Sequence, residues 1–177
     1  MITDMEMIVL VDESVHEIGT APKLASHHAH TPRHRAFSLY IFDPAGRVLI
    51  TQRALSKKVW PGVWTNSVCG HPAPGESHEA AIVRRTQYEL GMTVSDIEVV
   101  LPDYRYTTPP FQGIIENEIC PVYRAVATSD PKPNPAEVEA YMWMTWSDFV
   151  AAMKQTPDLY SYWAKDHYSQ LSALKFP

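Results

Sequence analysis

The segment GHPAPGESHEAAIVRRTQYELGM, Gly70 to Met92, decides the fold because it joins a turn rich in glycine and proline to the clearest helix of the chain. The helix is expected over Glu76 to Gly91. Apolar residues predict one buried side for it: Ala80, Ile82, Val83, Tyr88 and Leu90. Gly91 can adopt the left-handed conformation that ends many helices. The segment therefore predicts an exposed turn, then a helix that stops at Gly91.

Apolar runs rich in β-branched and aromatic residues on both sides of this helix predict strands. The runs are Glu6 to Asp12, Arg35 to Asp43, Arg47 to Arg53, Ile97 to Tyr106, Ile114 to Ala127 and Val138 to Trp146. The residues PAG join the second and third runs as a hairpin. Two more helices are expected, SDFVAAMK with Ser147 as N-cap and Leu159 to Leu174. These elements predict an α/β (α+β) fold, a mixed sheet covered by helices, in one compact domain over residues 1–177.

The composition is that of an ordinary globular protein, because 45% of the 177 residues are apolar and 20% are charged. A formal net charge of −5 argues against a nucleic-acid-binding surface. The first residues are acidic where a signal peptide needs basic ones, and no run approaches the roughly 20 apolar residues of a membrane span. Two cysteines are too few for a disulfide scaffold. We therefore expect a cytoplasmic protein with no membrane or nucleic-acid partner and, without a long apolar stripe, a monomer.

Two carboxylates occupy the apolar run IIENEICPVY, Ile114 to Tyr123. Because side chains alternate along a strand, Glu116, Glu118 and Cys120 are expected on one face. A solvated sheet edge would explain them. Buried on one face, however, the two carboxylates would repel each other and cost several kcal/mol unless a cation or a shared proton neutralised them. The pattern favours a metal site.

Histidines cluster in HHAHTPRH, from His27 to His34, and His71 stands two residues after Cys69. Each of His27, His28, His30 and His34 alone is typical of a surface. Together with the glutamates, imidazoles form a mixed nitrogen and oxygen site that suits zinc, manganese, iron or magnesium. No second CxxC or HxxxH pair accompanies Cys69, so a structural zinc finger is not expected.

The loop TNSVCGHPAPGE, Thr65 to Glu76, leaves several roles open for Cys69: nucleophile, metal ligand, half of a disulfide, or an acid and base. Basic residues form a second group: Lys23, Arg53, Lys57, Lys58, Arg84 and Arg85. A solvated charge is the simplest interpretation of each, and we keep it for Lys58. If lysines and arginines converged near a metal they would form a diphosphate pocket.

The segment that decides the fold resembles the Nudix box. Its glycines, arginine and two of its glutamates are matched by Gly70, Glu76, Arg84, Glu89 and Gly91. Arg85 and Tyr88 stand where the box has further glutamates, and Thr86 replaces an apolar residue. Nudix hydrolases use these carboxylates to hold the metals that activate water. The resemblance therefore implies a Nudix fold that does other chemistry on a diphosphate.

Longer motifs narrow the resemblance. RALSKKVWPGVWTNSVCGHP, YELG, DYRY and ENEICPV are similar to those of the type 1 isopentenyl-diphosphate isomerases, and the similarity runs from about Lys23 to Trp163. It implies interconversion of isopentenyl and dimethylallyl diphosphate. Two rivals are a Nudix hydrolase of nucleotides, which the substituted carboxylates disfavour, and a non-catalytic metal-binding module, which leaves Cys69 and Tyr106 unexplained.

The resemblance also implies the site residues. The family's metal ligands fall on His27, His34, His71, Glu116 and Glu118, with magnesium, manganese or zinc as the ion. The catalytic groups fall on Cys69 and Glu118, assisted by Tyr106, and the pocket tryptophan falls on Trp163, beside Tyr162 where proline is common. Diphosphate contacts fall on Lys23, Arg53, Lys57 and either Arg84 or Arg85. Glu89 matches a carboxylate that binds a second magnesium ion together with the diphosphate. His28 and His30 match nothing and are left as surface residues.

The expected reaction moves a double bond by adding one proton and removing another. Two acid and base groups on opposite faces of a flat allylic unit are the minimum, and Cys69 and Glu118 can supply them. We therefore favour a proton carrier over a nucleophile for Cys69. Trp163 would place an aromatic face against the intermediate tertiary carbocation, which is worth about 2 kcal/mol or more when desolvated. Trp143 and Trp146 are expected to pack in the core.

Overall fold

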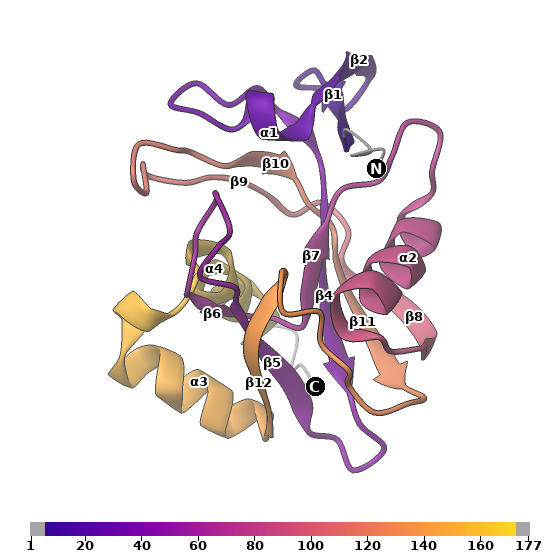
Figure 1. The fold of residues 1–177 in the computed structure, drawn as a ribbon, viewed down its shortest axis with the longest axis vertical. Coiled ribbons are helices and arrows are strands. Elements are labelled where there is room, and N and C mark those ends of the chain that lie inside the picture. Colours follow the sequence, from indigo (N-terminus) through magenta and orange to yellow (C-terminus); the bar gives the residue numbers. More distant parts are fainter. Residues whose placement is uncertain (1–5, 173–177) are drawn as a thin grey trace.

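The computed structural model describes residues 6–172 and builds them around two sheets (Figure 1). The smaller sheet has the order β2 (Glu17–Pro22), β1 (Met7–Val11), β3 (His34–Arg35), β10 (Asn117–Ile119) and β9 (Arg105–Thr107). The larger has the order β12 (Val138–Met144), β5 (Val48–Arg53), β4 (Phe37–Phe42), β11 (Val122–Ala127) and β8 (Val94–Leu101). Two short strands extend the larger sheet, with β6 (Trp64–Thr65) on β5 and β7 (Val68–Gly70) on β4. Both sheets mix parallel and antiparallel pairs.

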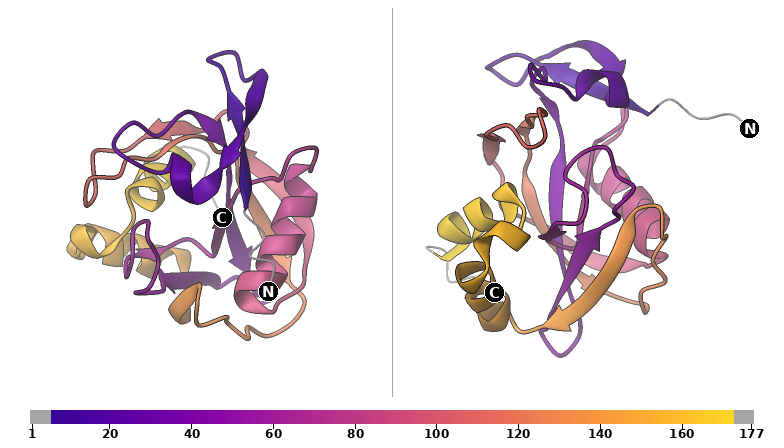
Figure 2. Two further views of the ribbon diagram at one scale, coloured as in Figure 1. Left: turned by 45° about the horizontal axis from the view of Figure 1, so that its top comes forward. Right: turned by 60° about the vertical axis from the view of Figure 1, so that its left-hand side comes forward.

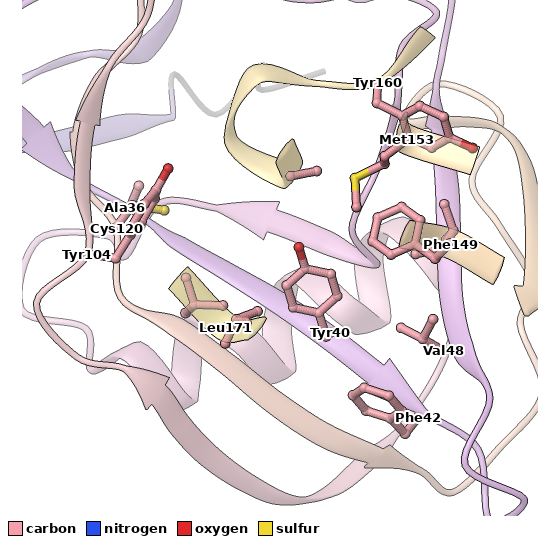
Figure 3. Packing of buried hydrophobic residues seen from close by; sticks show 13 residues of the cluster. Ala36, Tyr40, Phe42, Val48, Tyr104, Cys120, Phe149, Met153, Tyr160 and Leu171 are labelled. Carbon is pink, nitrogen blue, oxygen red and sulfur yellow. The ribbon is translucent and has the colours of Figure 1, made fainter. Parts of the chain in front are cut away.

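The larger sheet lies between helices on both faces (Figure 2). All six residues of β4 are buried, and its five hydrophobic residues are divided between two clusters. Leu39 and Ile41 pack with Ile82 of α2 (His78–Leu90). Tyr40 and Phe42 join the cluster that contains residues of α3 (Trp146–Gln155) and α4 (Tyr162–Leu171), as the packing around Tyr40 shows (Figure 3). The predicted mixed sheet covered by helices is therefore confirmed.

The predicted helix of the opening segment is confirmed with its end at Gly91, but it begins at His78 and not at Glu76. The Ser77 hydroxyl accepts a hydrogen bond from the Ala80 N–H at 3.1 Å, and Gly91 ends the helix at φ 59°. The predicted buried side is partly wrong, because Ala80 is exposed, as are Val83 at 52% and Tyr88 at 53%. The helix instead buries Ala81, Ile82, Arg85, Thr86, Glu89 and Leu90. Its inner side therefore carries charged groups as well as core residues.

Several predicted boundaries are wrong. The run Ile114 to Ala127 is not one strand, because Cys120 and Pro121 separate β10 from β11 and the two lie in different sheets. Proline lacks the N–H that a continuous ladder requires. Likewise, Ile97 to Tyr106 divides into β8 and β9.

The helices near the carboxyl terminus also begin elsewhere than predicted. Thr145, not Ser147, caps α3, since its hydroxyl accepts from the Asp148 N–H at 3.1 Å. A 3₁₀ turn at Pro157–Leu159 precedes α4, which begins at Tyr162. The predicted end at Leu174 lies outside the described residues. None of the described helices combines the length and the apolarity that crossing a bilayer demands.

Candidate active site and metal centre

One cavity of about 650 Å³ collects residues from both sheets and from the short helix α1 (Lys23–Ser26). The chain segments that meet there are far apart in sequence. Among its lining residues are Lys23, His27, Arg53, Lys57, Cys69, His71, Arg85, Tyr106, Glu116, Glu118 and Trp163. Most of the residues selected from the sequence therefore share one space.

Four of the candidate metal ligands converge beside this cavity. His27 follows α1, His34 lies on β3, His71 follows β7 and Glu118 lies on β10. Each offers one atom, and these atoms lie within 4.8 Å of one another in a buried position. The parallel pairing of β3 with β10 sets His34 beside Glu118. Three imidazoles and a carboxylate so placed are suited to a divalent metal ion.

The hydrogen bonds of the imidazoles favour metal binding. Nδ1 of His27 lies 2.6 Å from the Lys23 carbonyl oxygen, and Nδ1 of His34 lies 2.8 Å from that of Pro32. Because a carbonyl only accepts, each Nδ1 carries the proton and each Nε2 keeps its lone pair for a ligand. Nε2 of His34 lies 3.2 Å from Nε2 of His71, which is 3.0 Å from Glu118 Oε1. A cation between these atoms would relieve the crowding of their lone pairs, so the residues fit a divalent metal.

Glu116 stands next to this group. Its Oε2 lies 3.3 Å from Nε2 of His27, and it is buried without a hydrogen-bond partner. Such an oxygen can donate a lone pair to a metal ion. By contrast, His28 and His30 are exposed, as predicted.

Glu118 also contacts Tyr106. The tyrosine lies directly opposite Glu118 in the antiparallel pairing of β9 with β10. Its hydroxyl donates to Glu118 Oε2 at 2.7 Å. Burial and the carboxylates of Glu118 and Glu116 raise the pKa of Tyr106 well above its usual value. Tyr106 is therefore a neutral hydrogen-bond donor.

Cys69 lies on β7, opposite Ser38 of β4. Both it and Cys120 are free thiols, which excludes the disulfide between them. The sulfur of Cys69 donates to Asn66 Oδ1 at 3.3 Å and lies 3.6 Å from the Ser38 hydroxyl. Burial raises the pKa of the thiol to about 11, so Cys69 is protonated at neutral pH. We call Cys69, Tyr106, Glu118 and Trp163 the reaction group.

Basic side chains line the same cavity, and we call four of them, Lys23, Arg53, Lys57 and Arg85, the cation group. Three of them contact carboxylates of the chain. Lys23 Nζ lies 2.8 Å from Glu6, Lys57 is bonded to Glu137, and Arg85 donates to Glu89 at 2.6 Å. Arg53 instead donates to the carbonyls of Val59 and Trp60, and its guanidinium lies 5.8 Å from the ring centre of Trp163.

Other residues selected from the sequence lie differently. The side chain of Arg84 is 41% exposed, bound to Glu76, and not among the cavity-lining residues. Glu89 is buried behind Arg85 and does not line the cavity either. Lys58 lines the cavity and donates to the Leu24 carbonyl at 2.6 Å. The structure thus brings Arg85, and not Arg84, to the site.

Three site residues were not found from the sequence. Glu6 precedes β1, Glu137 precedes β12, and Asn66 lies in the TNSVCGH motif. Only Asn66 carried a signal, because it belongs to the motif that contains Cys69. Glu6 and Glu137 reach the cation group through long-range packing that no local pattern encodes.

Comparison with solved structures identifies the fold. A protein of Deinococcus radiodurans superposes with a TM-score of 0.65 at 22% identity, covering 85% of this chain and 90% of its own. A NUDIX hydrolase from Nitrosomonas europaea superposes with a TM-score of 0.56 at 14% identity, covering 80% and 90%. At such low identity these two likenesses concern the fold alone.

Sequence comparison identifies the family. The NUDIX domain family matches residues 32–164. The isopentenyl-diphosphate Delta-isomerase of Clavibacter sepedonicus is 49% identical over 158 residues, which cover 89% of this chain and 83% of that protein. The protein of the same name from Frankia alni is 46% identical over 170 residues, covering 96% and 88%. The chain therefore belongs to the isopentenyl-diphosphate Delta-isomerase family and carries a NUDIX domain.

Proposed function

We propose that Cys69 and Glu118 exchange protons with a five-carbon olefin held in the cavity. The relatives are named isopentenyl-diphosphate Delta-isomerases, and membership of their family gives the chain this activity. The enzyme interconverts isopentenyl and dimethylallyl diphosphate for isoprenoid biosynthesis. One observation carries the proposal: a protonated thiol and a hydrogen-bonded carboxylate line one cavity together with the cation group.

The proton balance of this reaction requires two groups. One adds a proton to the terminal carbon of the olefin, which leaves a tertiary carbocation at the neighbouring carbon. The other removes a proton from the carbon on the far side of that cation, and the electron pair of the broken C–H bond becomes the new double bond. Cys69 and Glu118 exchange these two roles when the reaction reverses, because no proton is gained or lost overall.

Tyr106 and Trp163 serve this intermediate in different ways. Tyr106 donates to Glu118 Oε2 at 2.7 Å and fixes the carboxylate in place. Trp163 lines the cavity and would present an aromatic surface to the carbocation. Trp60, Val63 and Trp163 form an apolar cluster that would keep out water, which would otherwise capture the cation as an alcohol.

The histidine and glutamate cluster is suited to a divalent metal, and we propose magnesium, manganese or zinc. Its holders would be His27, His34, His71, Glu116 and Glu118. When bound, the ion would withdraw charge from the Glu118 carboxylate and hold it rigidly. Backbone carbonyls of the chain accept from Nδ1 of His27 and His34, and so direct each Nε2 toward the metal position.

The substrate is a small diphosphate, and we propose that the cation group holds its phosphates. Lys23, Lys57 and Arg85 line the cavity with donors suited to phosphate oxygens. Glu89 would bind a second magnesium ion that arrives with the diphosphate. Its proximity to Arg85, which donates to Glu89 Oε1 at 2.6 Å, supports a place beside the phosphates.

We also propose that the chain works as a monomer of one domain in the cytoplasm, without nucleic-acid or membrane partners. The net charge of −5 supports the absence of a nucleic-acid partner. Size-exclusion chromatography with light scattering would test the monomer.

Proton NMR of isopentenyl diphosphate in deuterated water, with the protein and a divalent ion, tests the function. We expect the dimethylallyl signals to grow with incorporation of deuterium. Release of phosphate from a nucleotide panel without isomerisation would instead support a hydrolase. Arg85 disfavours that outcome. It stands where the hydrolase motif has a glutamate, and its guanidinium donates hydrogen bonds to the carboxylate of Glu89.

A further inference from the structure

The side chain of Asn66 is fully buried in the turn between β6 and β7. Its amide nitrogen donates to the carbonyls of Leu39 at 3.0 Å and Val68 at 2.9 Å. Because carbonyl oxygens only accept, these two bonds fix the orientation of the amide and turn its oxygen the other way. Asn66 Oδ1 is therefore an acceptor with a fixed direction.

Two residues of the reaction group donate to this one oxygen. The thiol of Cys69 lies 3.3 Å from Asn66 Oδ1, and the indole Nε1 of Trp163 lies 3.0 Å from it. Trp163 comes from α4, 97 residues further along the chain. We infer that Asn66 is a positioning residue, whose amide oxygen sets the orientation of both the thiol and the indole; this inference rests on the proposed function.

The physical reason is that neither donor has an easy alternative. Trp163 is 3% exposed, so an indole N–H without Asn66 would be buried and unpaired. The ring would then turn to find another acceptor and would change the surface it presents to the cavity. The thiol of Cys69 would keep only the longer contact of 3.6 Å to Ser38 and would lose its preferred rotamer. Because one oxygen serves both donors, a single change should disturb both groups.

The Thr65 hydroxyl also donates to Asn66 Oδ1, at 2.8 Å, but it has a second partner in the Ser161 hydroxyl at 2.9 Å. Thr65 can therefore leave the oxygen without becoming unpaired. The contact links the turn to the start of α4, where the Ser161 hydroxyl accepts from the Ala164 N–H at 3.2 Å. The geometry of the turn is thus coupled to the helix that carries Trp163.

The test compares kcat and KM of Asn66→Leu with those of the wild type. Leucine has a similar size but no polar atom, so we expect kcat to fall at least 100-fold while KM changes less than threefold. Thr51→Val is the matched control. The Thr51 hydroxyl donates to the backbone carbonyls of Asn66 and Ser67, so this variant loosens the same turn and leaves Oδ1 intact. It should lower thermal stability and keep kcat within threefold.

A second measurement separates positioning from general damage. The indole N–H resonance that Trp163→Phe removes from the NMR spectrum belongs to Trp163, and it should shift upfield in Asn66→Leu because its hydrogen bond is lost. An unshifted resonance, or a kcat within threefold of the wild type, would overturn the inference. The resonance is recorded without substrate, so a shifted resonance beside an inactive wild type would separate failure of the proposed function from failure of this inference.

Asn66→Asp decides the matter if Asn66→Leu does not fold. Aspartate keeps an accepting oxygen for the two donors when its carboxyl is protonated, because its other oxygen then donates to the carbonyl of Leu39 or Val68. We expect a folded protein whose indole resonance stays at its wild-type position and whose kcat is at least 10% of the wild-type value. Activity should follow the indole resonance, so a folded Asn66→Asp with an unshifted resonance and kcat below 1%, or with a shifted resonance and wild-type kcat, would overturn the inference.

Discussion

The reaction group and the cation group share one cavity but are held by different kinds of partner. Cys69 donates to a neutral amide, Trp163 to the same amide, and Tyr106 to the carboxylate of Glu118. In the cation group, by contrast, Lys23 and Lys57 contact the carboxylates of Glu6 and Glu137. Those carboxylates carry the same sign of charge as a diphosphate.

The difference indicates two kinds of task. Groups that act in a transition state gain from being fixed before the reaction, because they then need no reorganisation. Groups that grip a charged ligand must exchange one anion for another. We therefore expect changes in the reaction group to lower kcat, and changes in the cation group to alter KM.

The largest effect is expected for Cys69→Ala, which removes one of the two proton carriers. General acid and base groups contribute about 10²–10⁴-fold each, so kcat should fall by at least that range in a proton NMR assay. Cys120→Ala is the matched control, because its sulfur contacts the same Ser38 hydroxyl, at 3.5 Å, from the core side. If kcat of Cys69→Ala were close to that of Cys120→Ala, Cys69 would not be a proton carrier, and the contrast between the reaction group and the cation group would fail.

A smaller effect is expected for Lys57→Met, which keeps the length of the side chain and removes its charge. KM for isopentenyl diphosphate should rise about tenfold, equivalent to about 1.4 kcal/mol, while kcat changes less than threefold. Lys132→Met, on an exposed loop, should change neither. If kcat fell and KM did not, Lys57 would belong with the reaction group.

Most residues of the reaction group could be predicted from the sequence, but few of the contacts that position them could. Cys69 and His71 belong to one short motif, so their proximity could be read directly from the chain. The pairing of His34 with Glu118 needs the parallel contact of β3 with β10. That contact depends on the break at Pro121, which lies inside a run whose apolar residues predict one strand. A turn residue that separates two sheets has no signal in apolar periodicity.

The helix α2 shows the second reason for missed contacts. Its apolar pattern pointed to Val83 and Tyr88, yet both are exposed, and Arg85 and Glu89 are buried in their place. Periodicity assumes that the inner side of a helix is apolar. Here that side is shared between the core and the cavity, so two charged residues satisfy each other within it. Glu6 and Glu137 were not predicted for a similar reason, because only the tertiary fold brings them to Lys23 and Lys57.

Glu137→Gln tests the cation group by changing a carboxylate that contacts it instead of a basic residue. Lys57 holds the pKa of Glu137 below its usual value despite partial burial, so the carboxylate is charged at neutral pH. The substitution would remove the charge that Glu137 presents to Lys57. It would also weaken the contact with Arg85, whose Nη2 lies 3.4 Å from Glu137. We expect KM to fall two- to threefold, with a loss of unfolding free energy of about 1 kcal/mol. A rise in KM in the same steady-state assay would show that Glu137 assists binding instead of competing with it.

The smallest effect is a loss of folding stability as pH falls, and it arises at His167, which packs behind the reaction group. His167 is fully buried, its Nδ1 lies 3.0 Å from the Tyr40 hydroxyl, and its ring packs 4.6 Å from that of Tyr104, which stacks on Tyr106. Burial lowers the pKa of His167 to about 3. The unfolded chain, with a histidine pKa of about 6.5, therefore binds the proton first. The contribution of the neutral imidazole to stability is complete above that value and is lost as pH falls toward 3.

Each pH unit between these limits is worth about 1.4 kcal/mol, so lowering the pH from 7 to 5 should cost about 2 kcal/mol at this site. His167→Phe removes the titration, and its melting temperature should fall less over that interval than that of the wild type, by a few degrees in calorimetry. Tyr40→Phe loses the same hydrogen bond but keeps the imidazole, so its fall should match the wild type. Equal falls in all three proteins would mean that acid acts through the ion pairs of the cation group and not through the neutral support of the reaction group.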